Sequence, residues 1–96
     1  MTEPRDIRLK RLHMRSMRRG IREMDLILSG FASRALAAMG GEDLDAYESL
    51  LSENDQDLYA WVNGQSPAPA RHAPLVARIA EDARRAARSA HRDVLS

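Results

Sequence analysis

The sequence predicts an all-α fold, a small antiparallel bundle of about five helices. Apolar residues recur three and four positions apart, which is the spacing of a helix with one buried face. No segment alternates apolar and polar residues as a half-buried strand does, and β-branched residues are scarce. Glycine and proline residues separate the periodic segments, so each helix has a natural end.

The first helix is expected over 5–19, with Pro4 placed well for its first turn. One of its faces is apolar and is expected to join the bundle, and it consists of Ile7, Met14, Met17 and Ile21. Another face is basic and consists of Arg8, Arg11, Arg15, Arg18 and Arg22. Gly20 follows where a helix C-cap is expected.

The second and third helices are expected over 21–38 and 42–52, with Gly40 and Gly41 between them. The stripe that the second helix buries consists of Met24, Ile27, Leu28, Phe31 and Ala35. The third helix has carboxylates in its first turn, where the helix dipole favours negative charge. Its apolar side consists of Leu44, Tyr47, Leu50 and Leu51.

The fourth helix follows the polar run 54–57, which supplies N-cap side chains, and it ends at Gly64. It turns Leu58, Trp61 and Val62 inward. The last helix is expected over about 73–94, after a proline-rich connector. The whole chain, 1–96, is then one helical domain with a core over about 5–80. Its last helix has little to bury after Ala83, so the tail over 81–96 is expected to fray.

Charge is distributed unevenly, although the formal net charge is only +1. Residues 1–22 hold eight basic groups against two carboxylates, and 23–70 hold nine carboxylates against one arginine. Residues 71–96 are again basic, with six arginines against three carboxylates. Such asymmetry suits electrostatic docking onto a macromolecule.

The sequence offers no recognisable catalytic apparatus, so the chain is expected not to be an enzyme. Cysteine is absent, which excludes disulfides and thiolate metal sites. His13, His72 and His91 lie outside any metal-ligand spacing and are expected in surface or helix-packing roles. No glycine-rich phosphate loop or calcium loop is present. No apolar stretch is long enough to span a bilayer, so membrane insertion is not expected.

A cluster of charges surrounds Gly20. It consists of Arg18, Arg19, Arg22, Glu23 and Asp25. If one helix continued through the glycine, Arg19 and Glu23 would lie one turn apart, a pair worth only a few tenths of a kcal/mol in that order. Fold stability would then be a poor reason for the pattern. A glycine beside a guanidinium instead allows a partner to approach closely, so a binding role is expected.

The segment Arg19-Gly20-Ile21-Arg22-Glu23 resembles the R-G-x-x-E signature of the succinate dehydrogenase FAD assembly factor family, the bacterial type related to mitochondrial succinate dehydrogenase assembly factor 2. The segment 54–61, N-D-Q-D-L-Y-A-W, is similar to the family's D-x-D-L-[FY]-x-W segment. Gln56 departs from the proline common there. The similarity covers about 7–79, most of the chain.

The resemblance implies a five-helix bundle that binds the flavoprotein subunit of succinate dehydrogenase, or of fumarate reductase, and promotes covalent attachment of FAD to it. The chain itself would hold no tightly bound cofactor, would be monomeric when free and would act in the bacterial cytoplasm. The partner-binding residues implied are Arg18, Arg19, Gly20, Arg22, Glu23, Asp25, Asp55 and Asp57. Arg19 would contact the partner, Glu23 would orient Arg19 or pair with a partner cation, and helix capping explains Asp55 equally well.

Two other interpretations remain open at this point. The chain could be a small regulatory or antitoxin-like protein that binds a different partner. It could also bind nucleic acid or a membrane surface through its arginine stripe, and neutralising Arg8, Arg11 and Arg15 would then weaken binding. Aromatic residues make up only 4% of the chain, so no stacking platform for bases is evident and nucleic acid is not the expected partner.

Overall fold

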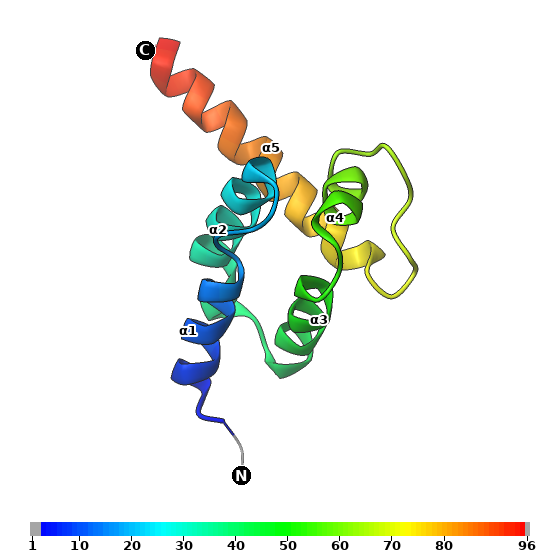
Figure 1. The fold of residues 1–96 in the computed structure, drawn as a ribbon. Helices are drawn as coiled ribbons and strands as arrows, with labels where there is room; N and C mark the ends of the chain where they lie inside the picture. The colour runs from blue at the N-terminus through cyan, green and yellow to red at the C-terminus, as the bar shows by residue number, and fades with distance from the viewer. Residues whose placement is uncertain (1–2, 96) are drawn as a thin grey trace.

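The structure, a computed structural model, describes the backbone of residues 3–95 and the side-chain surroundings of residues 3–89. Within that range it contains α-helices and one short 3-10 helix, η1, and no strand (Figure 1). The elements in order are α1 (Arg5–Arg15), α2 (Arg22–Ala35), η1 (Leu36–Ala38), α3 (Gly41–Leu51), α4 (Asp55–Val62) and α5 (Ala73–Leu95). The predicted all-α fold with five helices is therefore confirmed.

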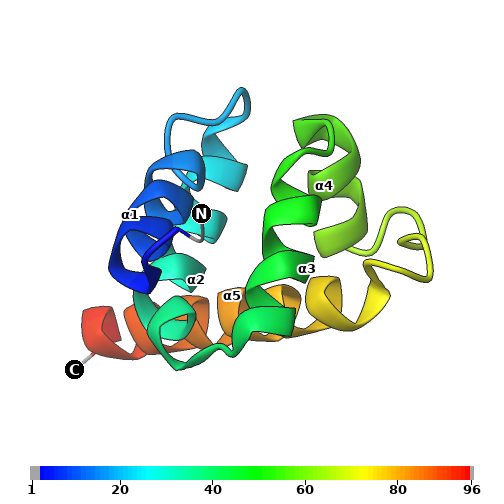
Figure 2. The same ribbon diagram turned by 90° about the horizontal axis from the view of Figure 1, so that it is seen from below.

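Helix α5 lies across the two pairs formed by the other four helices. Figure 2 shows α1 with α2 at one side and α3 with α4 at the other, while α5 runs across beneath both pairs. Helix α5 packs against α2 and α4. The chain turns sharply between α1 and α2, and the turn between α3 and α4 lies at the same end of the molecule (Figure 2). These two turns carry the candidate site.

The core lies where the amphipathic faces of all five helices meet. Its fully buried members include Leu12 of α1, Met24 of α2 and Ile79 of α5. The aromatic centre is formed by Phe31 and Tyr47, whose ring centroids lie 5.7 Å apart. The remaining buried apolar residues are Leu28, Ala32, Leu36, Met39, Leu44, Leu50, Leu51, Leu58, Leu75 and Val76. The buried stripes predicted for α2 and α3 match this core, except that Ile27 and Ala35 are only partly buried.

A hydrogen-bonded pair lies inside this apolar core. The Ser16 hydroxyl donates to the Leu12 carbonyl at 2.8 Å, and Ser16 Oγ lies 2.6 Å from the Tyr47 hydroxyl. Since the serine proton is engaged with the carbonyl, the tyrosine hydroxyl is the donor to Ser16. Burial raises the pKa of the Tyr47 phenol above its usual value, so the neutral form that donates this hydrogen bond is favoured.

Three of the four residues of the apolar face expected to join the bundle are exposed, and only Ile21, which lies beyond α1, is partly buried against the core. Ile7, Met14 and Met17 expose 53%, 69% and 48% of their surface. Leu12 and Ser16, four residues apart, point into the core instead. The prediction was wrong because it followed hydrophobic periodicity alone, while a serine with a buried hydrogen-bond partner occupies a core position.

Helix α1 is shorter than the predicted 5–19. It ends at Arg15, with Ser16 as its C-cap, and Arg18 takes a left-handed backbone conformation at φ 55°. Gly20 is therefore not a C-cap, because a short irregular segment separates it from the helix end. The capping expected from the run 54–57 is confirmed, since Asn54 Oδ1 accepts from the backbone N–H groups of Gln56 and Asp57.

Helix α5 begins at the expected place and extends to Leu95. His72, just before it, is buried, and its ring lies 5.8 Å from that of Trp61, so its helix-packing role is confirmed. Trp61 is itself partly buried against the core. The environments of 90–96, including His91, lie outside the described residues, and the expected fraying of 81–96 stays a prediction. No described helix is long and apolar enough to cross a membrane.

Candidate functional site

Arg19 lies at the centre of the candidate site, and its side chain turns into the protein. The guanidinium is only 12% exposed and reaches from the α1–α2 turn to the α3–α4 turn. Its Nε donates to Asp55 Oδ1 at 2.8 Å, and Nη2 lies 2.7 Å from the same oxygen. Nη1 donates to the carbonyls of Arg15 and Leu51 at 3.1 and 3.2 Å. These carbonyls belong to the last turns of α1 and α3, where a positive charge is stabilising.

Gly20 belongs to the same arrangement. Its backbone N–H donates to Asp55 Oδ2 at 2.5 Å, so the two oxygens of one carboxylate bind two neighbouring residues. A Cβ atom built on Gly20 would lie 3.0 Å from Asp55 Oδ2, closer than side chains normally tolerate. A larger residue at this position would therefore require the Asp55 carboxylate to shift, so the glycine suits a close approach within the molecule. Asp55 is the first residue of α4, and its carboxylate is held across to the α1–α2 turn while Asn54 caps the helix.

The premise of the stability argument, that Arg19 and Glu23 lie one turn apart on a continuous helix, is therefore wrong. Because α1 ends at Arg15, Arg19 and Glu23 do not share one continuous helix. Among the described residues, no hydrogen bond or ion pair joins Glu23 to Arg19, and Asp55 takes that place. The partner of Arg19 lies 36 positions along the chain, a separation that local spacing could not reveal.

Asp25 forms a further hydrogen bond within the α1–α2 turn. Its carboxylate accepts a 2.9 Å hydrogen bond from the backbone N–H of Arg18, the residue in the left-handed conformation. The structure thus joins Arg19, Gly20 and Asp55 in one cluster and Arg18 with Asp25 in a second one beside it. Asp57 is exposed in the first turn of α4, and no described contact links it to either cluster.

Besides Asp57, the predicted site residues with exposed charged side chains are Arg18, Arg22 and Glu23, which lie at the α1–α2 turn and the start of α2. Glu23 lies in the first turn of α2, where the helix dipole favours its negative charge. We define these three residues as the exposed charges of the junction. Their partner-binding role, like that of the other residues predicted from the motif, stays a prediction.

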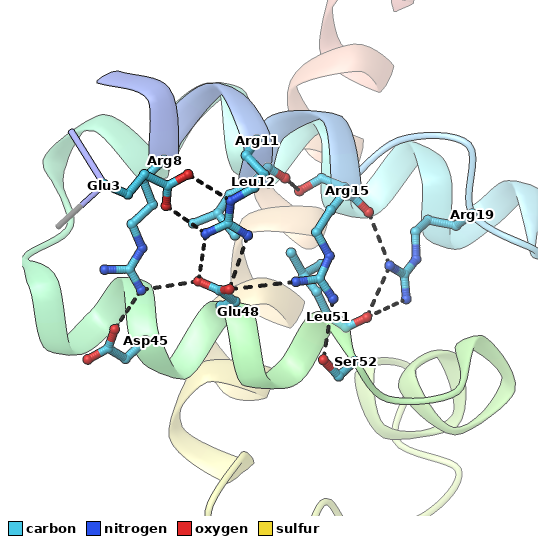
Figure 3. A network of polar contacts seen from close by, with 11 residues as sticks. Glu3, Arg8, Arg11, Leu12, Arg15, Arg19, Asp45, Glu48, Leu51 and Ser52 are labelled. Carbon is cyan, nitrogen blue, oxygen red and sulfur yellow. Dashed lines mark hydrogen bonds and ion pairs between the residues drawn. The ribbon is translucent and has the colours of Figure 1, made fainter. Parts of the chain in front are cut away.

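The arginine stripe of α1 is largely used within the protein. Figure 3 shows Arg8, Arg11 and Arg15 extending from α1 toward α3. Arg8 Nη2 pairs with Asp45 Oδ1 at 2.5 Å, and Arg11 Nη1 donates to Glu48 Oε2 at 3.0 Å. Arg11 also holds Glu3 at 2.9 Å, and Arg15 donates to Ser52 Oγ at 3.3 Å. Sequence analysis did not single out Glu48, because its role depends on the packing of α1 along α3.

This network lowers the pKa of two of its carboxyl groups, those of Glu48 and Glu3. The hydrogen bonds from Arg11 lower the pKa of Glu48, and the nearby charges of Arg11 and Arg8 add to the effect. Arg11 likewise lowers the pKa of Glu3. These arginines therefore join two helices, which leaves them poorly available for a phosphate backbone or a lipid surface.

No group of histidine, cysteine and carboxylate side chains within the described residues could hold a metal ion.

Another polar contact that the sequence did not predict joins His72 Nε2 to Glu53 Oε1 at 3.3 Å. This hydrogen bond, followed by that of Arg71, lowers the pKa of Glu53. It connects the start of α5 to the α3–α4 turn that also receives Arg19.

Comparison with known proteins bears on the whole of this site. A family model described as "Flavinator of succinate dehydrogenase" matches residues 10–83. A curated relative from Candida glabrata, "Succinate dehydrogenase assembly factor 2, mitochondrial", is 46% identical over 74 residues, which is 74% of this chain and 48% of the relative. The protein of that name from Saccharomyces cerevisiae is 51% identical over 59 residues, 62% of this chain and 36% of the relative.

A further relative, "Succinate dehydrogenase assembly factor 2-B, mitochondrial" from Drosophila ananassae, is 37% identical over 82 residues. These residues are 83% of this chain and 50% of the relative. The chain thus spans half the length or less of these curated relatives. The family match includes both turns of the candidate site, the core and the part of α5 up to Ala83. With the matched segment covering most of its length, the chain belongs to the succinate dehydrogenase flavinator family.

Proposed function

We propose that this chain binds the flavoprotein subunit of succinate dehydrogenase and promotes covalent attachment of FAD to a histidine of that subunit. The proposal is supported by the family match over 10–83 and by the names of the relatives. The flavoprotein subunit of fumarate reductase is proposed as a second client. The chain acts as a binding factor and not as an enzyme, so the covalent bond forms with groups of the partner.

The observation that carries this proposal is the way the two turns are joined. Arg19 donates hydrogen bonds to Asp55 and to the carbonyls of Arg15 and Leu51, and these bonds join the two turns. The exposed charges of the junction lie on the turn that these bonds hold in place. A binding surface whose geometry is set in advance loses little entropy when it docks.

Docking places the flavin and the histidine of the partner in a reactive arrangement, a contribution through proximity and orientation. Glu23 pairs with a cation of the partner, while Arg18 and Arg22 pair with carboxylates. Arg19 and Asp55 act indirectly by shaping the turn. Such a polar interface is salt-sensitive and of moderate affinity, which suits a factor that leaves once the partner has matured.

We further propose that the free chain is monomeric, lies in the bacterial cytoplasm and holds no tightly bound cofactor of its own. The nucleic-acid and membrane alternatives lose support because Arg8, Arg11 and Arg15 face carboxylates of α3. A regulatory role with another partner predicts a stable complex and no change in flavin content.

The direct test compares cells with and without this chain. Denatured flavoprotein subunit is separated by electrophoresis, and the fluorescence of its covalent flavin is measured in the gel. We expect a large loss of covalent flavin without the chain, with recovery when the chain is supplied again. Unchanged fluorescence in both the succinate dehydrogenase and the fumarate reductase subunit would contradict the proposal.

A further inference from the structure

The outward face of α1 is an apolar surface that the fold leaves uncovered. Ile7 and Met14 lie two turns apart on it, Met17 follows just beyond the end of the helix, and each of the three exposes about half of its surface or more. A shallow groove of about 430 Å³ lies along this face and is lined by Ile7, Lys10, Arg11, Met14 and Arg15. Large apolar side chains gathered on one exposed face mark an interaction surface more often than single scattered ones do.

The charges around the groove are mainly positive, with Asp6, an exposed carboxylate in the first turn of α1, as the exception. The guanidinium groups of Arg11 and Arg15 turn toward Glu48 on α3 (Figure 3), so mainly the stems of these side chains line the groove. Lys10 is exposed within the groove, and no ion pair within the described part of the chain involves it. Arg18 and Arg22 are exposed beyond the end of the helix, again without an ion pair among the described residues. The groove is thus an apolar strip with positive charges along it.

The strip is continuous with the junction. Met17 immediately precedes Arg18, and the chain then passes through Gly20 to Glu23. A partner that contacts the exposed charges of the junction therefore meets α1 next. Methionine side chains suit such a surface because they are unbranched and adapt to the shape of what they contact.

We propose that the outward face of α1 binds an amphipathic segment of the flavoprotein partner, with apolar side chains in the groove and carboxylates facing Lys10, Arg18 and Arg22. This inference rests on the proposed function and extends its binding surface from the junction to α1. The positive charges beside the groove favour an occupant that carries carboxylates. A second copy of this chain, docked face to face, would place the same cations opposite one another, which is unfavourable.

The test uses the full chain and the purified flavin-free flavoprotein subunit of succinate dehydrogenase, with affinity measured by calorimetry. The double variant Ile7→Ser/Met14→Ser removes the apolar strip, and Lys10→Glu reverses the charge in the groove. Ala46→Ser on the exposed face of α3 and Arg85→Glu on α5 are the matched controls. Circular dichroism shows whether each variant keeps its fold, which is expected because these side chains are exposed.

We expect the double variant and Lys10→Glu each to weaken binding by about tenfold or more, while the controls stay within about twofold of the parent chain. Affinity unchanged in both groove variants, with the parent chain still binding, would overturn this inference and leave the proposed function standing. A parent chain that binds neither this subunit nor the flavoprotein subunit of fumarate reductase, measured in the same way, would overturn the proposed function itself.

Two further outcomes would replace the occupant. Analytical ultracentrifugation of the parent chain is expected to show a monomer, and a dimer broken by Ile7→Ser/Met14→Ser would assign the face to a second copy. Flotation with phosphatidylglycerol vesicles is expected to show no binding. Vesicle binding lost in the double variant, with flavoprotein affinity unchanged, would assign the face to a lipid surface.

Discussion

Asp55 has two carboxylate oxygens and uses each for a different donor. Oδ1 accepts from the Arg19 side chain, and Oδ2 accepts from the Gly20 backbone. The side chain is 18% exposed and that of Arg19 is 12% exposed, so water replaces these contacts poorly. At the scale of single residues, Arg19 and Gly20, the motif residues expected to contact a partner, thus form hydrogen bonds with Asp55 of the same chain.

Replacing Asp55 by asparagine is expected to destabilise the fold by about 1–3 kcal/mol. An amide keeps the shape, but its NH2 group must face one of the two donors, and the charge opposite Arg19 is lost. Urea denaturation followed by circular dichroism measures the change. Asp57→Asn is the matched control, because Asp57 stands exposed in the same first turn of α4. Equal stability of the two variants would mean that the Arg19–Asp55 contact contributes nothing.

Glu23 gives the opposite expectation. It is exposed, so Glu23→Gln should leave the unfolding free energy within about 0.5 kcal/mol of the parent chain. If it pairs with a partner cation, affinity for the flavoprotein subunit and the rate of covalent flavin formation should fall by about tenfold. Glu42→Gln is the control, since Glu42 is exposed in the first turn of α3. Flavin formation as fast with Glu23→Gln as with Glu42→Gln would remove Glu23 from the site.

At the scale of helices, ion pairs between α1 and α3 link stability to pH. The folded-state pKa of Glu48 is lowered from 4.5, mainly by Arg11, so the folded state binds its proton less readily than the unfolded state. The stabilisation from Glu48 is therefore complete well above pH 4.5 and is lost as pH falls through the lowered value. The side chain is 33% exposed, so screening by water keeps the contribution small.

Glu48→Gln is expected to cost about 0.5–1 kcal/mol at neutral pH, measured by urea denaturation, and progressively less in acid. The carboxamide cannot take part in the charge interaction with Arg8 and Arg11, and below the lowered pKa the parent carboxyl cannot either. Glu42→Gln on the same helix should show a smaller cost, because no ion pair among the described residues involves Glu42. A cost that is the same at pH 3 and pH 7 would contradict an electrostatic origin.

Helix number and order could be predicted from the sequence, because glycine, proline and apolar spacing act locally. Asn54 as an N-cap was predictable for the same reason. The end of α1 at Arg15 was missed because neither glycine nor proline stands at Ser16. The Ser16 side chain forms hydrogen bonds with the Leu12 carbonyl and the Tyr47 hydroxyl, and Tyr47 lies 31 positions away. In the candidate site, the motif residues were found by resemblance, but the inward turn of Arg19 depends on a contact across the fold.

At the scale of the whole molecule, two pairs of helices depend on α5 for support. The described side chains of α5 that enter the core are Leu75, Val76 and Ile79, all within its first two turns. One turn later, Arg34 of α2 donates to both oxygens of Asp82 through Nε and Nη2, at 2.9 and 2.6 Å. A bidentate arginine–carboxylate contact of this kind is among the stronger polar contacts in proteins. Support for α2 thus reaches at least to Asp82.

Shortening α5 in two steps tests how far this support extends. A chain that ends at Ser89 keeps both the apolar contacts and the Arg34–Asp82 pair, so its unfolding free energy should stay within about 0.5 kcal/mol of the parent chain. A chain that ends at Ala80 loses that pair and should be destabilised by about 1 kcal/mol or more, because α2 then loses its bidentate partner. Urea denaturation of both truncated chains separates the two steps. A large loss already at Ser89 would place part of the cooperative fold in the last residues, whereas no loss at Ala80 would confine it to the first turns of α5.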